Sequence, residues 1–419
     1  MKENKLKKKE HIYLFFCLCF LVYFTTYLGR LNYAASLAEI INTENFSRGS
    51  AGLIGTAFFF SYGIGQFLNG FIGDYINSKY MVFLGLFISG LMNAIMGSAS
   101  SSEVMTVVWC LNGFAQSMIW SPLLKSICDN LQVENQRRFC MYINYSVPLG
   151  TLTAYALTAF LINNNNWHVA FFVPSVIIIA IAIIWLLCMG YIEKITGNNI
   201  LVVQEENNIP IVKGSMKNIF IQSGLIFVGI ALLVQGALKD SVTTWIPVYL
   251  IDNYNIGNIV AILSTIVIPI CNLFGVSFAV VVEKKTKGNE VLAASIFYCI
   301  CGLSLLALWG LNGKSVVVSI ALLAIATTVM MSVNSLLIAV LPSRFGKIGR
   351  ASSVSGILNS SVYAGCAGST YGIGVLSERF GWDKVILLWV AGAFLAFLIC
   401  LFTSRKWREY VNTKLDKIK

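Results

Sequence analysis

Long apolar runs recur along this chain, and their length constrains its fold more than any other feature of the sequence. A transmembrane helix needs about 20 consecutive apolar residues, because a helix rises about 1.5 Å per residue and the hydrocarbon layer is about 30 Å thick. The sequence therefore predicts an all-α membrane protein, with its functional groups inside a helical bundle. Twelve spans are expected, at residues 12–38, 50–73, 80–99, 104–127, 139–162, 169–192, 218–250, 257–282, 291–311, 315–341, 351–376 and 385–404.

The overall composition supports a membrane protein. Of the 419 residues, 57% are hydrophobic and only 12% are charged, whereas soluble domains carry about 25% charged residues. The net charge of +11 does not indicate nucleic-acid binding, because the segments outside the spans contain no basic patch with interleaved aromatic residues.

The positive charge instead follows a membrane topology. If the N-terminus is inside, 24 of the 30 lysines and arginines fall on the cytoplasmic side, four fall on the opposite side, and Arg30 and Lys239 lie within spans. Lysine and arginine accumulate in cytoplasmic loops, so both chain ends are predicted to be cytoplasmic. Short loops and the lack of a transit sequence favour the cytoplasmic, inner membrane of a bacterium.

Two features of the sequence repeat at one spacing. Lys239 lies 209 positions after Arg30, and Glu283 lies 209 positions after Asp74. Repeats of this length are typical of transporters built from two related halves. We therefore predict a six-helix bundle at 1–192, a polar cytoplasmic linker at 193–217 and a second six-helix bundle at 218–419.

Arg30 and Lys239 place positive charge where the membrane is apolar. A charged residue at mid-span costs at least about 2.5 to 3.5 kcal/mol on insertion scales, so it normally faces a wet cavity and a polar partner. Tyr27 lies three positions before Arg30, and Gln235 lies four positions before Lys239, so each shares a helix face with its cation. We expect the two cations to bind one small anion, Arg30 through paired hydrogen bonds and Lys239 as a point charge.

Four stretches of sequence carry a family resemblance: YFTTYLGRLNYA at 23–34, YGIGQFLNGFIGD at 62–74, NGFAQSMIWSPLLK at 112–125 and KDSVTTWIPVYL at 239–250. With the two predicted halves, they resemble the major facilitator superfamily over the whole chain. Within it they look like the organophosphate:phosphate antiporter family, the relatives of glycerol-3-phosphate and hexose-phosphate transporters. The stretch at 112–125 is the most specific, because its polar residues, tryptophan and proline keep the family's spacing.

The resemblance implies roles for individual residues. It makes Arg30 and Lys239 the phosphate-binding pair and Tyr27 a hydrogen-bond donor in the cavity. The family has arginine at the position of Lys239, lysine at that of Gln66 and, in glycerol-phosphate carriers, histidine at that of Ser146, so this site is less positive. The further residues expected to contact substrate are polar or aromatic and lie in the expected spans 50–73, 104–127 and 139–162: Asn112, Gln116, Trp120, Tyr62, Gln66, Tyr142 and Tyr145.

The turn after the second span resembles the superfamily's loop motif, without its usual arginine run. It contains Gly70, Asp74 and Lys79, and its acidic member recurs as Glu283. We expect Asp74, Lys79 and Glu283 to join charge networks that break when the two halves move. A solvated turn that follows the positive-inside rule is the other interpretation.

The charges also predict a mode of transport. Closing a cavity around two cations desolvates both, at several kcal/mol per ion, so the empty carrier returns slowly and one anion exchanges for another. The charges alone predict the exchange of two anions by alternating access, and the family resemblance implies that these are a phosphate ester and inorganic phosphate. Asp240 leaves proton symport open, because it could pair with Lys239 in the empty carrier or take up a proton. The side chains of neighbouring helical residues point about 100° apart, so we expect Asp240 to influence Lys239 only indirectly.

Two other functions stay open. One is a proton-coupled carboxylate (sugar acid) symporter of the anion:cation symporter type, which also carries arginine in an R-x-N setting on its first span. The other is a transporter-like membrane sensor of a phosphorylated metabolite. An enzyme is not expected, because the loops contain no catalytic constellation, metal-ligand spacing or glycine-rich phosphate loop. The predicted protein is a monomer in the lipid bilayer without cofactor or metal, and its partners are a small anion and either inorganic phosphate or protons.

Overall fold

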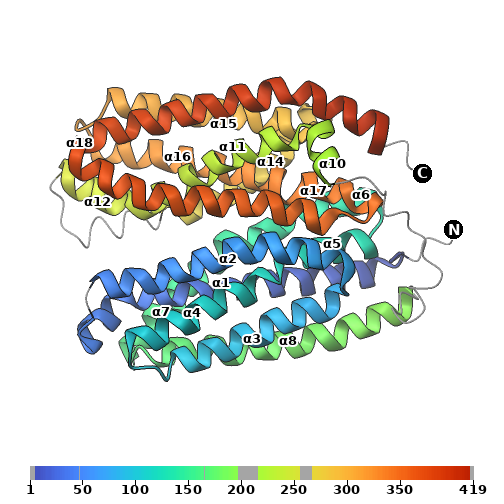
Figure 1. Ribbon diagram of the computed structural model, residues 1–419, viewed down its shortest axis with the longest axis horizontal. Helices are drawn as coiled ribbons and strands as arrows, with labels where there is room; N and C mark the ends of the chain where they lie inside the picture. Colours follow the sequence, from blue (N-terminus) through green and yellow to red (C-terminus); the bar gives the residue numbers. More distant parts are fainter. Residues whose placement is uncertain (1–4, 47, 165, 197–215, 255–266, 416–419) are drawn as a thin grey trace. The chain divides into compact units, whose positions relative to one another are not determined.

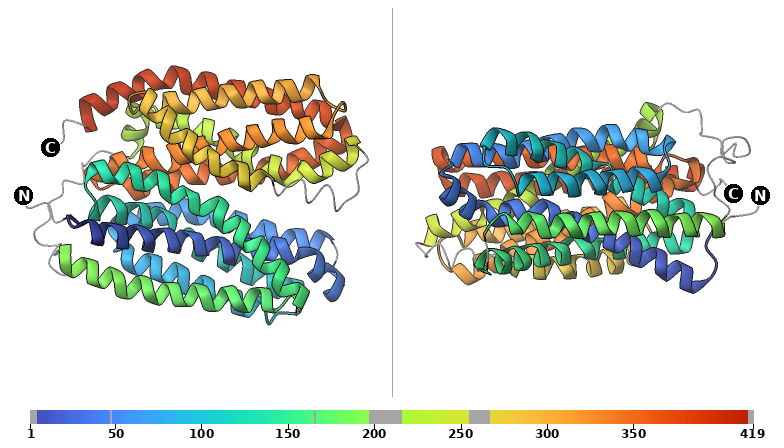
Figure 2. Two further views of the ribbon diagram at one scale, coloured as in Figure 1. Left: turned by 180° about the vertical axis from the view of Figure 1, so that it is seen from behind. Right: turned by 90° about the horizontal axis from the view of Figure 1, so that it is seen from below.

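The computed structural model describes residues 5–46, 48–164, 166–196, 216–254 and 267–415, and the regular structure of these residues is helical (Figures 1 and 2). By their contacts the residues form two units. The first comprises Met1–Val212 and Phe345–Ile357, and the second comprises Lys213–Arg344 and Leu358–Lys419.

Long helices make up the first unit. Within it, α3 packs against α8 and α4, α2 packs against α4, and α1 packs against α7 and α8 (Figure 1). Its elements are α1 (Lys9–Glu44), α2 (Arg48–Tyr75), α3 (Ser78–Met96), α4 (Ser102–Ser117), α5 (Trp120–Asn130), α6 (Val133–Tyr142), the 3-10 turn η1 (Ile143–Tyr145), α7 (Ser146–Asn164) and α8 (Val169–Thr196).

Glycine allows α2 and α4 to approach closely. A Cβ atom on Gly113 of α4 would come within 2.4 Å of the Phe58 carbonyl oxygen on α2. Any side chain at this position would therefore push the helices apart. Just beyond this contact the expected span 104–127 is interrupted, because α4 ends at Ser117 and α5 begins at Trp120.

Breaks in the helices are a feature of the second unit. Gly224, with a φ of 79°, separates α10 from α11 at a bend of 80°, and Gly381, with a φ of 74°, divides α18. Its elements are α10 (Met216–Ser223), α11 (Leu225–Gly236), the π-helix η2 (Ala237–Ser241), α12 (Val242–Tyr254), α14 (Val267–Lys285), α15 (Glu290–Gly310), α16 (Val316–Asn334), the π-helix η3 (Ser335–Val340), α17 (Leu341–Ser343), the 3-10 turn η4 (Arg344–Ile348), α18 (Ala351–Tyr410) and the π-helix η5 (Val411–Leu415). Residues of η4 and the start of α18 belong by their contacts to the first unit.

The described residues contain nine helices that are long and apolar enough to cross a membrane, or ten if α10 and α11 form one bent span. The predicted all-helical membrane architecture is therefore confirmed. The first part of the expected span 257–282 and most of the expected linker 193–217 lie outside the described residues. The count of twelve spans stays a prediction.

Candidate substrate-binding site

Arg30 lies in the middle of α1 and is buried, with 7% of its surface exposed. Three aromatic rings surround its guanidinium carbon, at 4.4 Å for Tyr62, 5.3 Å for Tyr27 and 5.4 Å for Phe58. The negative face of an aromatic ring attracts a cation by about 0.5 to 2 kcal/mol. These neutral rings therefore stabilise and position the arginine without cancelling its charge.

Gln116 on α4 fixes the other side of the arginine. Nε of Arg30 donates a hydrogen bond to Oε1 of Gln116 over 3.2 Å. The Gln116 amide nitrogen donates to the backbone carbonyls of Thr26 and Gly29 at 3.2 Å each and to the hydroxyl of Ser89 at 3.1 Å. Because its NH₂ group bonds to these oxygens, Gln116 must direct its own oxygen at Arg30.

A buried polar network supports this arrangement from behind. Asn112, four residues before Gln116 on α4, donates to the Gly29 carbonyl at 2.9 Å and accepts a 2.6 Å hydrogen bond from Ser89. Asn93 of α3 donates to the same carbonyl at 3.2 Å and accepts from Asn32 at 2.8 Å. The Asn112 side chain, expected to contact substrate, thus holds the α1 backbone beside Arg30.

Two donors near the start of α5 are buried, and no acceptor for either lies in the part of the chain that the structure describes. Trp120 packs on Tyr23 with ring centroids 4.4 Å apart, and Tyr23 contacts Tyr27 edge-on at 5.7 Å. Among the described residues, neither Trp120 Nε1 nor the Gln66 amide nitrogen has a hydrogen-bond partner, whereas Gln66 Oε1 accepts from Ser121 at 3.2 Å. Unsatisfied buried donors are costly, so both are candidates for binding a ligand oxygen.

Three other residues predicted to bind substrate have described contacts outside the group around Arg30: Tyr142, Tyr145 and Gln235. Tyr142 ends α6 with 44% of its surface exposed, and its ring stacks on that of Tyr145 at 6.4 Å. In the second unit, Gln235 is buried and donates to the carbonyl of Met330 at 3.3 Å. Gln235 therefore joins α11 to α16 within the second unit.

Lys239 lies in the π-helix η2, and its ammonium is 3.0 Å from Oδ1 of Asp240. The expectation that Asp240 acts on Lys239 only indirectly is wrong. The lysine stem has four flexible carbons, so its ammonium reaches the neighbouring carboxylate even though the two side chains leave the backbone in different directions. The π-helix also departs from the regular helical geometry on which the prediction rested.

Asp74 at the end of α2 binds the beginning of α18. Its carboxylate accepts backbone N–H bonds from Ser352 at 3.0 Å and Ser353 at 3.2 Å, and it also accepts the Ser353 hydroxyl. The Lys125 ammonium donates to the carbonyls of residues 73, 74 and 76 at 2.8 to 3.1 Å. Asp74 therefore caps a helix from a distant part of the sequence.

Lys79, expected in one charge network with Asp74, instead pairs with Glu193 of α8. Its ammonium lies 2.7 Å from the Glu193 carboxylate, which also accepts a 3.0 Å bond from the amide of Asn77. The indole of Trp185 donates to the Lys79 carbonyl at 2.9 Å. The pairing with α8 follows from the packing of α3 on that helix.

The second unit contains a buried ion pair that the sequence analysis missed. Glu290, fully buried at the start of α15, accepts a 2.7 Å bond from Nε of Arg344 and a 3.0 Å bond from the indole of Trp407. Glu283, the acid predicted from the repeat, lies seven positions earlier in the last turn of α14 and is partly exposed. Glu290 follows an asparagine helix cap, and an acidic residue in a first turn is usual, so its sequence gave no sign of burial.

Three further residues near Arg30 were not expected from the sequence: Ser89, Asn93 and Phe58. Ser89 and Asn93 lie four positions apart in an apolar stretch, so both face one side of α3. That spacing is a signal for a buried polar network. Phe58 carries no such signal, because a phenylalanine in a span is ordinary.

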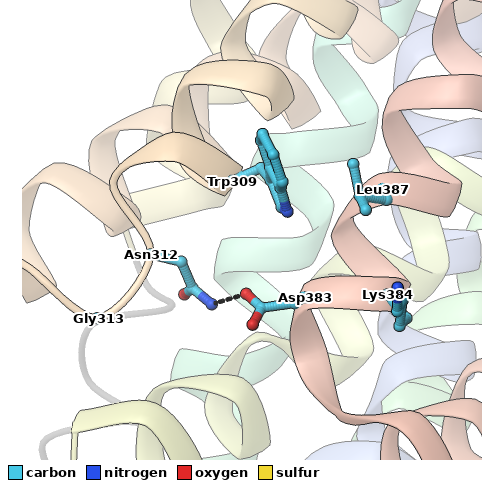
Figure 3. Close-up of a pocket in the computed structure, with 6 residues that line it drawn as sticks. All are labelled: Trp309, Asn312, Gly313, Asp383, Lys384 and Leu387. Atoms are coloured by element: carbon cyan, nitrogen blue, oxygen red, sulfur yellow. Dashed lines mark hydrogen bonds between the residues drawn. The ribbon is translucent and has the colours of Figure 1, made fainter.

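A cavity of about 460 Å³ lies at one end of the second unit, lined by Trp309, Asn312, Gly313, Asp383, Lys384 and Leu387 (Figure 3). Asn312 donates to Asp383 at 2.7 Å and accepts from the hydroxyl of Tyr249 at 2.7 Å. None of the predicted substrate residues lines it. Among the described residues, no cluster of three or more His, Cys, Asp or Glu side chains is arranged to hold a metal ion.

Comparisons with known proteins show which family the chain is similar to. The family model described as Major Facilitator Superfamily matches residues 19–370. A probable hexose phosphate transport protein of Chlamydia muridarum is 23% identical, over 96% of this chain and 94% of the relative. A glycerol-3-phosphate transporter of Bacillus subtilis is 23% identical, over 94% of this chain and 92% of the relative.

A solved structure agrees in fold. The proton:xylose symporter XylE, determined with 6-bromo-6-deoxy-D-glucose, has a TM-score of 0.72 over 97% of each chain at 13% identity. The family match covers most of the chain, and the resemblance read from the four sequence stretches is confirmed. The chain belongs to the Major Facilitator Superfamily.

Proposed function

We propose that this chain is a secondary active transporter that exchanges a phosphate ester for inorganic phosphate by alternating access. The observation that carries the proposal is the buried guanidinium of Arg30, fixed at mid-span by the neutral side chains of Gln116, Tyr27, Phe58 and Tyr62. Such a fixed cation suits a phosphate group, which accepts paired hydrogen bonds from arginine.

Relatives support the choice of phosphate over other anions. The chain matches proteins named for hexose phosphate and for glycerol 3-phosphate over nearly its whole length. Trp120 Nε1 and the Gln66 amide, buried donors without acceptors among the described residues, suit further oxygens of a polar ligand. They are neutral, so a polar organic part or a phosphate oxygen fits them without added charge.

Lys239 supplies the second cation of the proposal, as the sequence repeat predicts. In the proposed carrier, 1–192 and 218–419 are the two halves, joined by the linker 193–217, and they move about the bound anion. The protein acts as a monomer in a bacterial cytoplasmic membrane, with both chain ends in the cytoplasm. Inorganic phosphate is its counter-substrate.

Reconstitution tests the proposal directly. Purified protein in liposomes loaded with unlabelled sugar phosphate should take up labelled phosphate without any imposed gradient. Arg30→Ala should weaken phosphate binding by roughly tenfold to a hundredfold, because a hydrogen bond to a charged group contributes about 1.5 to 3 kcal/mol.

The matched control is Arg379→Ala, which removes an exposed arginine near the break in α18. This variant should exchange phosphate like the wild type. If Arg30→Ala remains folded and exchanges normally, Arg30 does not bind the substrate. Uptake of a carboxylate in place of phosphate, driven by a proton gradient, would support the symporter alternative.

A further inference from the structure

Lys239 has an internal counter-anion. Its ammonium lies 3.0 Å from the Asp240 carboxylate, with 17% and 34% of the two side chains exposed. We propose that Asp240 replaces the substrate at Lys239 in the empty carrier and binds a proton when the substrate takes Lys239. The protein would then perform net, proton-coupled uptake in addition to exchange. This inference rests on the proposed function, in which Lys239 binds the substrate.

The backbone holds the pair at a defined place. η2 connects α11 to α12, and the carbonyl of Lys239 accepts a 2.7 Å bond from the hydroxyl of Thr243. Immediately before η2, a Cβ atom on Gly236 would come within 2.0 Å of the Val362 carbonyl, so α11 and α18 are in close backbone contact there. A π-helical turn of this kind is often found at functional sites. The local backbone thus presents a lysine and a carboxylate together.

Few titratable groups face the pair from the elements that pack on η2. These elements are α11, α12 and α16, with α18 beside Gly236. The described parts of α11 and α16 contain no titratable residue, and α18 brings Tyr363 and Cys366 to this level. The acid of α12, Asp252, lies three turns further along and accepts the indole N–H of Trp382 at 2.9 Å. Asp240 therefore lies beside Lys239, whereas Asp252 bonds to a different residue.

Electrostatics link the proton to the substrate. In the empty carrier the Lys239–Asp240 pair is neutral as a whole, so closing the site does not desolvate an uncompensated lysine. When a phosphate oxygen accepts the ammonium hydrogen bonds, Asp240 loses the bond from Lys239 and lies next to a second anion. Two adjacent anions disfavour each other, so Asp240 takes a proton from the external water. Release of the anion inside lets Asp240 release this proton and pair with Lys239 again.

The test compares two activities in the same liposomes. Wild-type protein in liposomes without internal substrate should accumulate labelled phosphate when the outside is acidic, and a pH dye inside should report about one proton per phosphate beyond that carried by the phosphate itself. Asp240→Asn should lower the ratio of net uptake to exchange by about tenfold or more, because the empty variant keeps the charge of Lys239 without the Asp240 carboxylate. Asp240→Glu, which keeps the carboxylate, should retain net uptake.

Asp252→Asn is the matched control and should leave the ratio unchanged. Exchange without net uptake by the wild type would overturn the inference and leave the proposed function intact. Absence of both activities from folded wild-type protein would instead overturn the proposed function. An unchanged ratio in Asp240→Asn would also overturn the inference, and the proton count in wild-type protein tests it even if this variant fails to fold.

Discussion

At the scale of single residues, the orientation of the Gln116 amide decides how Arg30 presents its charge. The Gln116 nitrogen bonds to two α1 carbonyls and to Ser89, so its oxygen accepts from Nε of Arg30. That bond occupies one edge of the guanidinium and adds no negative charge. A neutral acceptor at this position holds the arginine and preserves its attraction for an anion.

Gln116→Glu should therefore impair anion binding more than a neutral substitution. The new carboxylate would pair with Arg30 and compete with phosphate, so we expect phosphate affinity to fall by roughly tenfold or more, since bonds between charged groups contribute about 1.5 to 3 kcal/mol. Gln116→Met removes the acceptor without adding charge and should have a smaller effect. Calorimetric titration of the detergent-solubilised proteins with phosphate measures both, and equal affinities for the Glu variant and the wild type would contradict this role of Gln116.

Sequence spacing predicted only those contacts of Arg30 that lie within its own helix. Tyr27 is one helical turn from Arg30, so its position 5.3 Å from the guanidinium follows from α1 alone. Phe58 and Gln116 lie on α2 and α4, and their contacts with Arg30 depend on how those helices pack. The pairing of Lys239 with Asp240 required the side-chain conformation within η2, which helical spacing does not specify.

At the scale of helices, Asp74 shows how one element ends and another begins. The first N–H groups of a helix lack partners within it, and at α18 those of Ser352 and Ser353 bond to the Asp74 carboxylate at the end of α2. The close approach is possible because Gly70 lies opposite Gly356, where an added Cβ would come within 2.8 Å of the Gly356 Cα. One carboxylate thus joins α2 to the start of α18.

Asp74→Ala should destabilise this junction by about 0.5 to 2 kcal/mol, the range found when a capping side chain is removed from a helix. Asp74→Asn keeps an oxygen acceptor and loses only the charge, so its effect should be smaller. Thermal unfolding of the two variants in detergent, followed by tryptophan fluorescence, would show this order. A melting temperature of Asp74→Ala equal to that of the wild type would show that the cap contributes nothing to stability.

Hydropathy located the helices better than it located their interruptions. The expected spans 12–38, 50–73 and 169–192 lie within α1, α2 and α8. Residues 104–127 and 218–250 are each expected to form a single span, yet the first is interrupted after Ser117 and the second bends at Gly224. An apolar run records only which residues avoid water, and both sides of such a break are apolar.

At the scale of the whole molecule, the charge distribution and the repeat carry information that no single helix contains. Each unit holds a buried carboxylate in an ion pair near the start of a long helix. Glu193 pairs with Lys79 at the start of α3, and Glu290, the first residue of α15, pairs with Arg344 of η4. Burying such a pair costs desolvation energy. Removing one partner strongly destabilises the folded protein, because the other charge stays buried. By the positive-inside rule, the beginnings of both helices are predicted to lie on the cytoplasmic side.

Reporter fusions test this predicted topology. Alkaline phosphatase folds to an active enzyme only outside the cytoplasm, so a fusion after Ser100, between α3 and α4, should be active. The same reporter fused after Gln132, between α5 and α6, should be inactive, because this loop is predicted to be cytoplasmic together with both chain ends. Since 24 of the 30 lysines and arginines fall on that side, the bias that orients the chain is strong. The opposite pattern of activities, at equal amounts of fusion protein on an immunoblot, would reverse the assigned orientation and the direction of the proposed proton-coupled uptake.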